Sequence, residues 1–274
     1  MLALATLVLA LATPAPTATP PPTGQRVLGL IRATFRSHRP PPPYVTYTLV
    51  RAQNASNGYP DPVGSYTEHI WCRTSDRAAL ARRVYRDDAR GDLTFERPAF
   101  NEARDPGPPT ADVFEPAPAH PQPVEFVPTP EPLPTQVTVI GGVSRIFEFD
   151  YDVQSMDVEG DAIHLLVYPK RDPERNRIRE IWADKKTYEL QKLSATDKLF
   201  EERGPVYPVG FTITMGVVDG YPVVTDVHGT VGGGYNDDGK IVDFHFKDIA
   251  FPKTLPAWYF DARSYSHHQN DAPS

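Results

Sequence analysis

The segment Gly210-Phe-Thr-Ile-Thr-Met-Gly-Val-Val218, then Asp219-Gly220, then Tyr221-Pro-Val-Val-Thr-Asp-Val-His-Gly-Thr-Val231, decides the fold class of this chain. Both long runs are rich in β-branched and aromatic residues, which are favoured in β-strands. The Asp-Gly pair between them tolerates the positive φ angles that a tight hairpin turn requires. The segment therefore predicts an antiparallel β-hairpin.

The same pattern extends in both directions from this hairpin. Further strands are predicted over residues 44–50, 65–73, 137–140, 144–153, 162–168, 177–184, 189–196 and 240–249. Turn-forming residues separate several of them, at 159–161, 184–187 and 236–239. Consecutive strands with short turns predict a mainly β (α+β) fold, in which a curved antiparallel sheet or half-open β-barrel carries one or two covering helices.

One short amphipathic helix is predicted before the first strand, over residues 25–37. Apolar residues recur there at helical spacing, at Val27, Leu28, Leu30, Ile31 and Phe35. The four prolines at 40–43 cannot continue a helix. Residues 75–90 are open to two interpretations: a helix capped by Ser75 or Asp76, or a turn followed by a strand. The alanine content of this stretch favours the helix.

The N-terminal residues predict export from the cytoplasm. Residues 1–12 form an apolar run that ends in Ala10-Leu11-Ala12, a small-x-small cleavage pattern, although no Lys or Arg precedes it. Residues 13–23 contain only Ala, Thr and Pro, a composition typical of an extended tether. Residues 24–274 are predicted to form one domain.

A proline-rich insertion interrupts this domain at residues 98–134, which contain twelve prolines. Irregular or polyproline structure is therefore expected there. The insertion is predicted to wrap around the domain through Phe100, Val113, Phe114 and Phe126, or to serve as a separate recognition segment.

Composition excludes some classes of partner. The formal net charge of −7 and the isoelectric point near 5.6 give no basic surface for nucleic acid. Cys72 is the single cysteine, so no internal disulfide can form, and its strand-like context indicates a small core residue.

Three stretches of the sequence resemble the central part of LolA-like lipoprotein carriers, the superfamily that sorts outer-membrane lipoproteins. They are Asp161-Ala-Ile-His-Leu-Leu-Val-Tyr-Pro-Lys170, Arg177-Ile-Arg-Glu-Ile-Trp-Ala-Asp184 and Thr187-Tyr-Glu-Leu-Gln-Lys-Leu-Ser-Ala-Thr-Asp197. The matching features are a strand ending in Pro169-Lys170, Trp182, the terminal Asp184 and the turn after it. The similarity covers about two thirds of the chain, and the insertion at 98–134 departs from the family outline.

The resemblance implies a periplasmic carrier whose apolar interior shields acyl chains or lipoproteins, without cofactor or covalent chemistry. Such a carrier is expected to act as a monomer and to exchange its cargo with a membrane release or receptor complex. Alternation along the predicted strands supplies ligand-binding candidates: Phe147, Phe149, Tyr151, Ile163, Leu165, Val167, Phe211, Ile213, Met215 and Val217. The competing interpretation is that these side chains form a filled core.

Motifs for catalysis or metal binding are weak. His267 and His268, and His228 with His245, lack the spacing of a known metal motif. Residues 236–239 fit a turn better than a calcium loop, and the glycines of 229–234 lack the Gly-Lys-Ser/Thr of a phosphate loop. No nucleophile elbow is present. The sequence therefore predicts a non-enzymatic binder without metal. The alternative is a structural or interaction protein of the cell envelope that uses its proline-rich segment. A third hypothesis, an exported hydrolase, has no candidate catalytic residues in the sequence.

Overall fold

The computed structural model describes residues 23–54, 65–84, 90–96, 107–116, 151–173, 175–200, 206–231, 240–261, 263–268 and 270–271. Their elements are α1 (Gly24–Ser37), β1 (Tyr44–Asn54), β2 (Tyr66–Arg73), β3 (Ala79–Val84), β4 (Arg90–Glu96), β5 (Tyr151–Glu159), β6 (Ala162–Pro169), β7 (Ile178–Asp184), β8 (Leu190–Phe200), β9 (Val206–Val218), β10 (Tyr221–Val231), β11 (Lys240–Ala250) and the 3₁₀ helices η1 (Ala257–Phe260) and η2 (Tyr265–His268).

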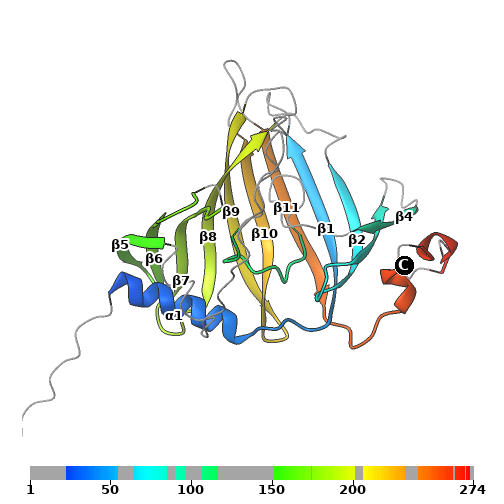
Figure 1. Ribbon diagram of the computed structural model, residues 1–274, viewed down its shortest axis with the longest axis horizontal. Helices are drawn as coiled ribbons and strands as arrows, with labels where there is room; N and C mark the ends of the chain where they lie inside the picture. The colour runs from blue at the N-terminus through cyan, green and yellow to red at the C-terminus, as the bar shows by residue number, and fades with distance from the viewer. Residues whose placement is uncertain are drawn as a thin grey trace, which may run out of the picture.

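Within these residues, eleven antiparallel strands form one open sheet in the order β4-β3-β2-β1-β11-β10-β9-β8-β7-β6-β5. Every neighbouring pair is consecutive in sequence except β1 and β11, so the first strand joins the last in the middle of the sheet. Figure 1 shows the sheet as one twisted, curved layer with α1 lying across it near the β5 side. The predicted fold class, a mainly β open sheet with a covering helix, is confirmed.

The predicted hairpin turns form where Gly, Asn and Asp permit positive φ. Gly160 (φ 63°) joins β5 to β6, and Asp219 (φ 51°) with Gly220 (φ 78°) joins β9 to β10. Asp184 closes the β7–β8 turn, because its carboxylate accepts hydrogen bonds from the backbone N–H groups of Lys186 and Thr187, both at 2.8 Å. These hydrogen bonds lower the pKa of Asp184. The turn predicted at 236–239 lies outside the described residues.

Most predicted strands are confirmed within a few residues of their ends. The strand predicted at 137–140 lies outside the described residues, and of the one predicted at 144–153 only the end is described. That end belongs to β5, which continues to Glu159. Residues 1–22, with the predicted signal and most of the tether, also lie outside the described part.

The helix favoured for residues 75–90 is wrong. The chain instead makes a turn at 74–76 and continues as β3. Arg73 donates two hydrogen bonds to Asp76, at 2.9 and 2.6 Å, and this pairing lowers the pKa of Asp76 to about 2. Ala79, Leu80 and Ala81 are all fully buried, since β3 packs on both faces. That tertiary packing outweighs the helix propensity of alanine. The sequence also gave no indication of β4, which pairs with β3.

A second, smaller hydrophobic cluster forms on the opposite face of β2 and β3. Trp71 and Leu80 alternate with inward-facing neighbours, so they point away from α1. Tyr259 of η1 covers them, with its ring 5.8 Å from that of Trp71. The C-terminal segment is therefore part of the folded structure, which the sequence did not indicate.

The N-terminus of α1 docks closely against β5. Thr23 caps the helix by accepting a hydrogen bond from the Arg26 N–H at 3.4 Å. Gln25 pairs with the edge of β5, because its side-chain amide donates to the Tyr151 carbonyl at 3.1 Å and accepts from the Val153 N–H at 3.4 Å. A Cβ on Gly24 would lie 2.7 Å from Cγ1 of Val153, so any larger residue forces Val153 or the helix to shift.

This contact gives a test of how α1 docks. Gly24→Ala is expected to lower the free energy of unfolding by about 1–3 kcal/mol through overpacking, although alanine favours helix. Gly29→Ala is the matched control, because no atom lies within 4 Å of the added Cβ. That change is expected to raise the free energy of unfolding by up to about 1 kcal/mol. Urea denaturation measures both values; stabilisation by both variants would contradict the docking.

Candidate ligand-binding face

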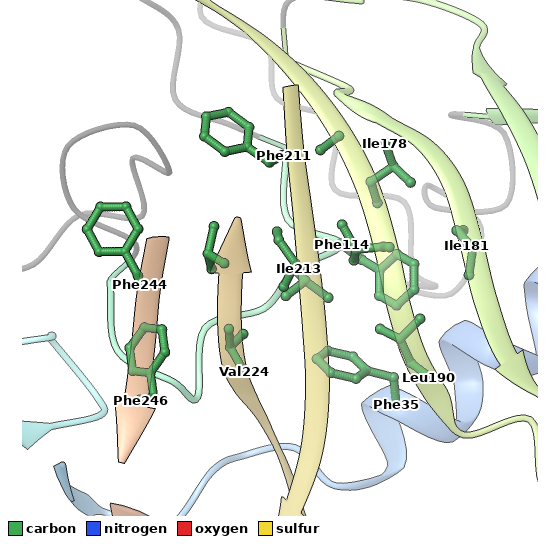
Figure 2. Close-up of a cluster of buried hydrophobic side chains, with 14 of the residues drawn as sticks. Phe35, Phe114, Ile178, Ile181, Leu190, Phe211, Ile213, Val224, Phe244 and Phe246 are labelled. Carbon is green, nitrogen blue, oxygen red and sulfur yellow. The ribbon is translucent and has the colours of Figure 1, made fainter. Parts of the chain in front are cut away.

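The inner face of the sheet, the face that contacts α1, carries a continuous layer of apolar side chains. Figure 2 shows part of it, with side chains from β7 to β11 pointing to the same side as Phe35 of α1. Five ligand-binding candidates belong to this cluster and are buried: Ile163, Leu165 and Val167 of β6, and Phe211 and Ile213 of β9. Tyr151 belongs to it as well. The alternation read from the sequence therefore identified the inward-facing side of both strands.

The other ligand-binding candidates differ in how deeply they are buried. Met215 is partly buried and packs against the cluster, whereas Val217 is 63% exposed at the end of β9. Phe147 and Phe149 lie outside the described residues. Val217 keeps the inward alternation, but it stands next to the β9–β10 turn, where none of the described covering elements buries it.

Several members of this face were missed by sequence reasoning. Phe244 and Phe246 of β11, Tyr47 and Leu49 of β1, and Ile178 and Ile181 of β7 are all buried in the same cluster. The period-2 alternation of the β1 and β11 pairs is visible in the sequence and could have identified them. Ile178 and Ile181 are three residues apart because the β7–β8 register shifts between Ile178 and Glu180, so alternation alone does not identify them. On β10 the register shifts between Val224 and Asp226, so the inward positions Val224 and Val227, both in the cluster, are three residues apart.

Helix α1 forms the first part of the cover over this face. It buries Val27, Leu28, Ile31 and Phe35 against the sheet, as its apolar spacing predicts. Arg32 is buried with them. Its guanidinium carbon lies 5.4 Å from the ring centres of both Phe114 and Tyr151. A buried cation is therefore flanked by two aromatic faces at the edge of the apolar layer.

Residues 107–116, here called the strap, form the second part of the cover. Val113 and Phe114 belong to the apolar cluster, and the Phe114 ring packs edge-on against Phe35 at 5.4 Å. The strap contacts β10 through one backbone hydrogen bond, from the Val224 N–H to the Pro109 carbonyl at 2.8 Å. Thus the prediction that the insertion wraps the domain is confirmed for Val113 and Phe114. Phe100 and Phe126 lie outside the described residues.

Charged groups join the strap to the C-terminal end of α1 and to the β2–β3 turn. Arg39 donates to the carbonyls of Thr110 and Ala111, at 2.8 and 2.9 Å. Arg36 pairs with Asp112 at 3.6 Å. Arg77 pairs with Glu115 at 2.9 Å. An open cavity of about 420 Å³ lies here, lined by Arg36, Arg39, Asp112 and Glu115.

The outer face differs in chemistry from the inner one. On β10 and β11, His228 pairs with Asp243 at 2.6 Å and His245 with Asp226 at 2.8 Å, across the ladder. His268 contacts Asp271 at 2.9 Å. Among the described residues, no three His, Cys, Asp or Glu side chains gather in a metal-binding arrangement. The paired histidines are cross-strand contacts of the sheet.

Cys72 lies on the inner face, fully buried, as a small apolar member of the core. The sequence-based interpretation of this residue is confirmed. Within the described residues, none of the helices has the length and apolar character needed to cross a membrane.

Comparison with solved structures adds to this description. The fold is similar to that of a LolA superfamily protein. That protein, from Nitrosomonas europaea, is 11% identical, with 84% of this chain and 95% of that chain covered and a TM-score of 0.42. A DUF1329 family protein from Desulfovibrio piger is 12% identical, covering 88% and 99% of the two chains, with a TM-score of 0.38. A chain of the Pseudomonas aeruginosa MucA/MucB complex is 14% identical, covering 86% and 95%, with a TM-score of 0.19.

The LolA superfamily is also the family that the sequence resembles. No family model matches the chain. No curated protein matches it in sequence. The ligand of this chain must therefore be argued from the inner face itself.

Proposed function

We propose that the protein binds the acyl chain of a lipid or lipoprotein on the inner face of its sheet and carries it without any chemical reaction. One observation carries this proposal: among the residues that the structure describes, the broad apolar inner face of the sheet is covered by a helix and an irregular strap. These covering elements make contacts with the sheet that include side-chain packing and, for the strap, the backbone hydrogen bond from the Val224 N–H to the Pro109 carbonyl. They can therefore move while the strand ladder stays intact.

The energetics set a minimum length for the ligand. The inner face is filled by side chains, so an acyl chain must displace part of the cover, including Val113 and Phe114 of the strap. Burying two such side chains is worth roughly 3–6 kcal/mol, and each buried methylene contributes ~0.8 kcal/mol. A chain of about eight or more methylenes is therefore needed to compete.

The competing function is that of a non-enzymatic structural or interaction protein of the cell envelope. The observation that favours it is the close packing of the inner face, where Leu165, Ile213 and Phe244 are almost completely buried. In that case the sheet has a permanent core, and the proline-rich insertion binds the partner.

The place of action belongs to the same proposal. The apolar run of residues 1–12 and the tether after it support export, and for a carrier of acyl chains the periplasm is the compartment between two membranes. A reporter fused after residue 23 that is active only outside the cytoplasm tests this point. Activity of the fusion inside the cytoplasm would contradict it.

A binding titration tests the carrier directly. The full chain, delipidated by organic extraction, is expected to bind a dansylated undecanoate at 1:1 stoichiometry, with the complex visible by native mass spectrometry. Met215→Gln, a near-isosteric change at the edge of the apolar layer, is expected to weaken binding at least threefold. Leu166→Gln on the outer face is the matched control and should change it less than twofold. A folded protein that binds no acyl probe would favour the interaction protein.

A further inference from the structure

The strap is compact and held in place by its own turns. The Ala111 N–H donates to the Pro108 carbonyl at 2.9 Å, and the Glu115 N–H donates to the Asp112 carbonyl at 2.9 Å. The Asp112 side chain accepts a further hydrogen bond from the Phe114 N–H at 3.0 Å. Two consecutive turns thus present Val113 and Phe114 together toward the sheet, while Asp112 and Glu115 flank them.

Val113 and Phe114 occupy the same apolar layer as the candidate ligand-binding residues. Figure 2 shows Phe114 and Phe35 on the side to which Ile213 and Leu190 point, and all four belong to one cluster. The strap is therefore an apolar segment of the chain itself, seated where an acyl chain would lie.

The positive and negative groups around the strap come from different parts of the chain. The arginines Arg36, Arg39 and Arg77 come from α1, the residues after it and the β2–β3 turn. Asp112 and Glu115, the carboxylate partners of Arg36 and Arg77, belong to the strap, as do the carbonyls of Thr110 and Ala111 that Arg39 contacts. Displacement of the strap would take both carboxylates away from Arg36 and Arg77, and both carbonyls away from Arg39. An anionic group entering there would replace the lost carboxylates.

We propose that the strap is an internal occupant of the inner face, and that the ligand which displaces it is an anionic amphiphile. Its apolar tail replaces Val113 and Phe114, and its carboxylate or phosphate head replaces Asp112 and Glu115 beside Arg36, Arg39 and Arg77. This inference rests on the proposed acyl-binding function and specifies the ligand class and the way the site is closed.

Strap opening can be measured without any ligand. Its ion pairs are partly exposed, so salt screens them. Hydrogen exchange at the Val224 amide, which is bonded to Pro109, reports whether the strap is seated. We expect exchange there to accelerate at least threefold between 50 mM and 1 M NaCl, and in the double variant Asp112→Asn/Glu115→Gln at low salt. The outer-face variant Asp226→Asn/Asp243→Asn removes equal charge and should leave this amide unchanged. A Val224 amide whose exchange changes in none of these cases would overturn the proposal that ion pairs hold the strap in place.

Ligand selectivity tests the head group. Laurate and dodecyl phosphate are expected to bind the full chain at least tenfold more tightly than dodecanol and dodecyltrimethylammonium. The two anionic ligands separate carboxylate from phosphate recognition. The variant Asp112→Asn/Glu115→Gln should bind laurate at least fivefold more tightly, since the internal competitor is weakened. Arg36→Gln/Arg77→Gln should lose the preference for anionic heads while still binding dodecanol.

The outcomes separate this inference from the function on which it rests. Acyl probes that bind without charge preference, with the Val224 amide still protected, would leave the carrier intact and overturn the strap as internal occupant. If the parent protein and the Asp112→Asn/Glu115→Gln variant are both folded and neither binds an acyl probe, the carrier function and this inference are overturned together.

Discussion

Leu165→Ala is expected to lower the free energy of unfolding by about 2–5 kcal/mol. Leu165 is 0% exposed and lies in the middle of the inner face on β6, so its truncation leaves a cavity beside residues that cannot fully relax. Leu166, the next residue, is 42% exposed on the outer face. The same change there, Leu166→Ala, is expected to cost less than about 0.5 kcal/mol.

This pair of variants is a matched control because the chemistry, the strand and the sheet position are the same and only the face differs. Urea denaturation followed by circular dichroism gives both values. Equal costs at the two positions would mean that the assignment of inner and outer faces along β6 is incorrect. The candidate ligand-binding face would then have to be reassigned as well.

Tyr259→Ala is expected to lower the free energy of unfolding by about 3–5 kcal/mol. Tyr259 is 2% exposed and packs edge-on against Trp71 and Trp258, at 5.8 and 4.5 Å between ring centres. Its loss would open the small cluster that joins the C-terminal segment to β2 and β3. The emission of both tryptophans should shift to longer wavelength as water reaches them.

The control for this variant is Tyr168→Ala, because Tyr168 is 61% exposed on β6. It should leave stability within about 0.5 kcal/mol of the parent. If Tyr259→Ala behaves like Tyr168→Ala, with unchanged tryptophan emission, the C-terminal segment is not docked on β3 as described. A folded sheet with a changed emission spectrum would show that the cluster is a separate packing unit.

The two clusters together explain how one sheet layer is stabilised on both sides. The inner face is covered by α1 and the strap, and part of the outer face over β2 and β3 is covered by η1. The rest of the outer face on β10 and β11 carries paired His and Asp residues suited to solvent. In the proposed function, the acyl chain replaces part of the cover on the inner face.

Much of the secondary structure could be predicted from the sequence alone, because its signals are local. The Asp219-Gly220 turn and the alternation on either side of it specify the β9–β10 hairpin without reference to the rest of the chain. The same reasoning located α1, β6, β7, β8 and β11. It also placed Phe211 and Ile213 on the buried side of β9.

The tertiary structure decided what depends on contacts between distant residues. Ala79 to Ala81 form a strand and not a helix, because β2 and β4 pair with them and both faces are buried. The pairing of β1 with β11, the docking of Tyr259 on Trp71 and the seating of Val113 and Phe114 under α1 have no local signal. The sequence by itself therefore determined most of the strands and turns, whose conformations follow from local backbone and side-chain preferences, but not β3 and β4. The tertiary structure decided which side chains fill the inner face and which segments cover it. These depend on the hydrophobic free energy of burial, which is gained only once segments far apart in the chain have come together.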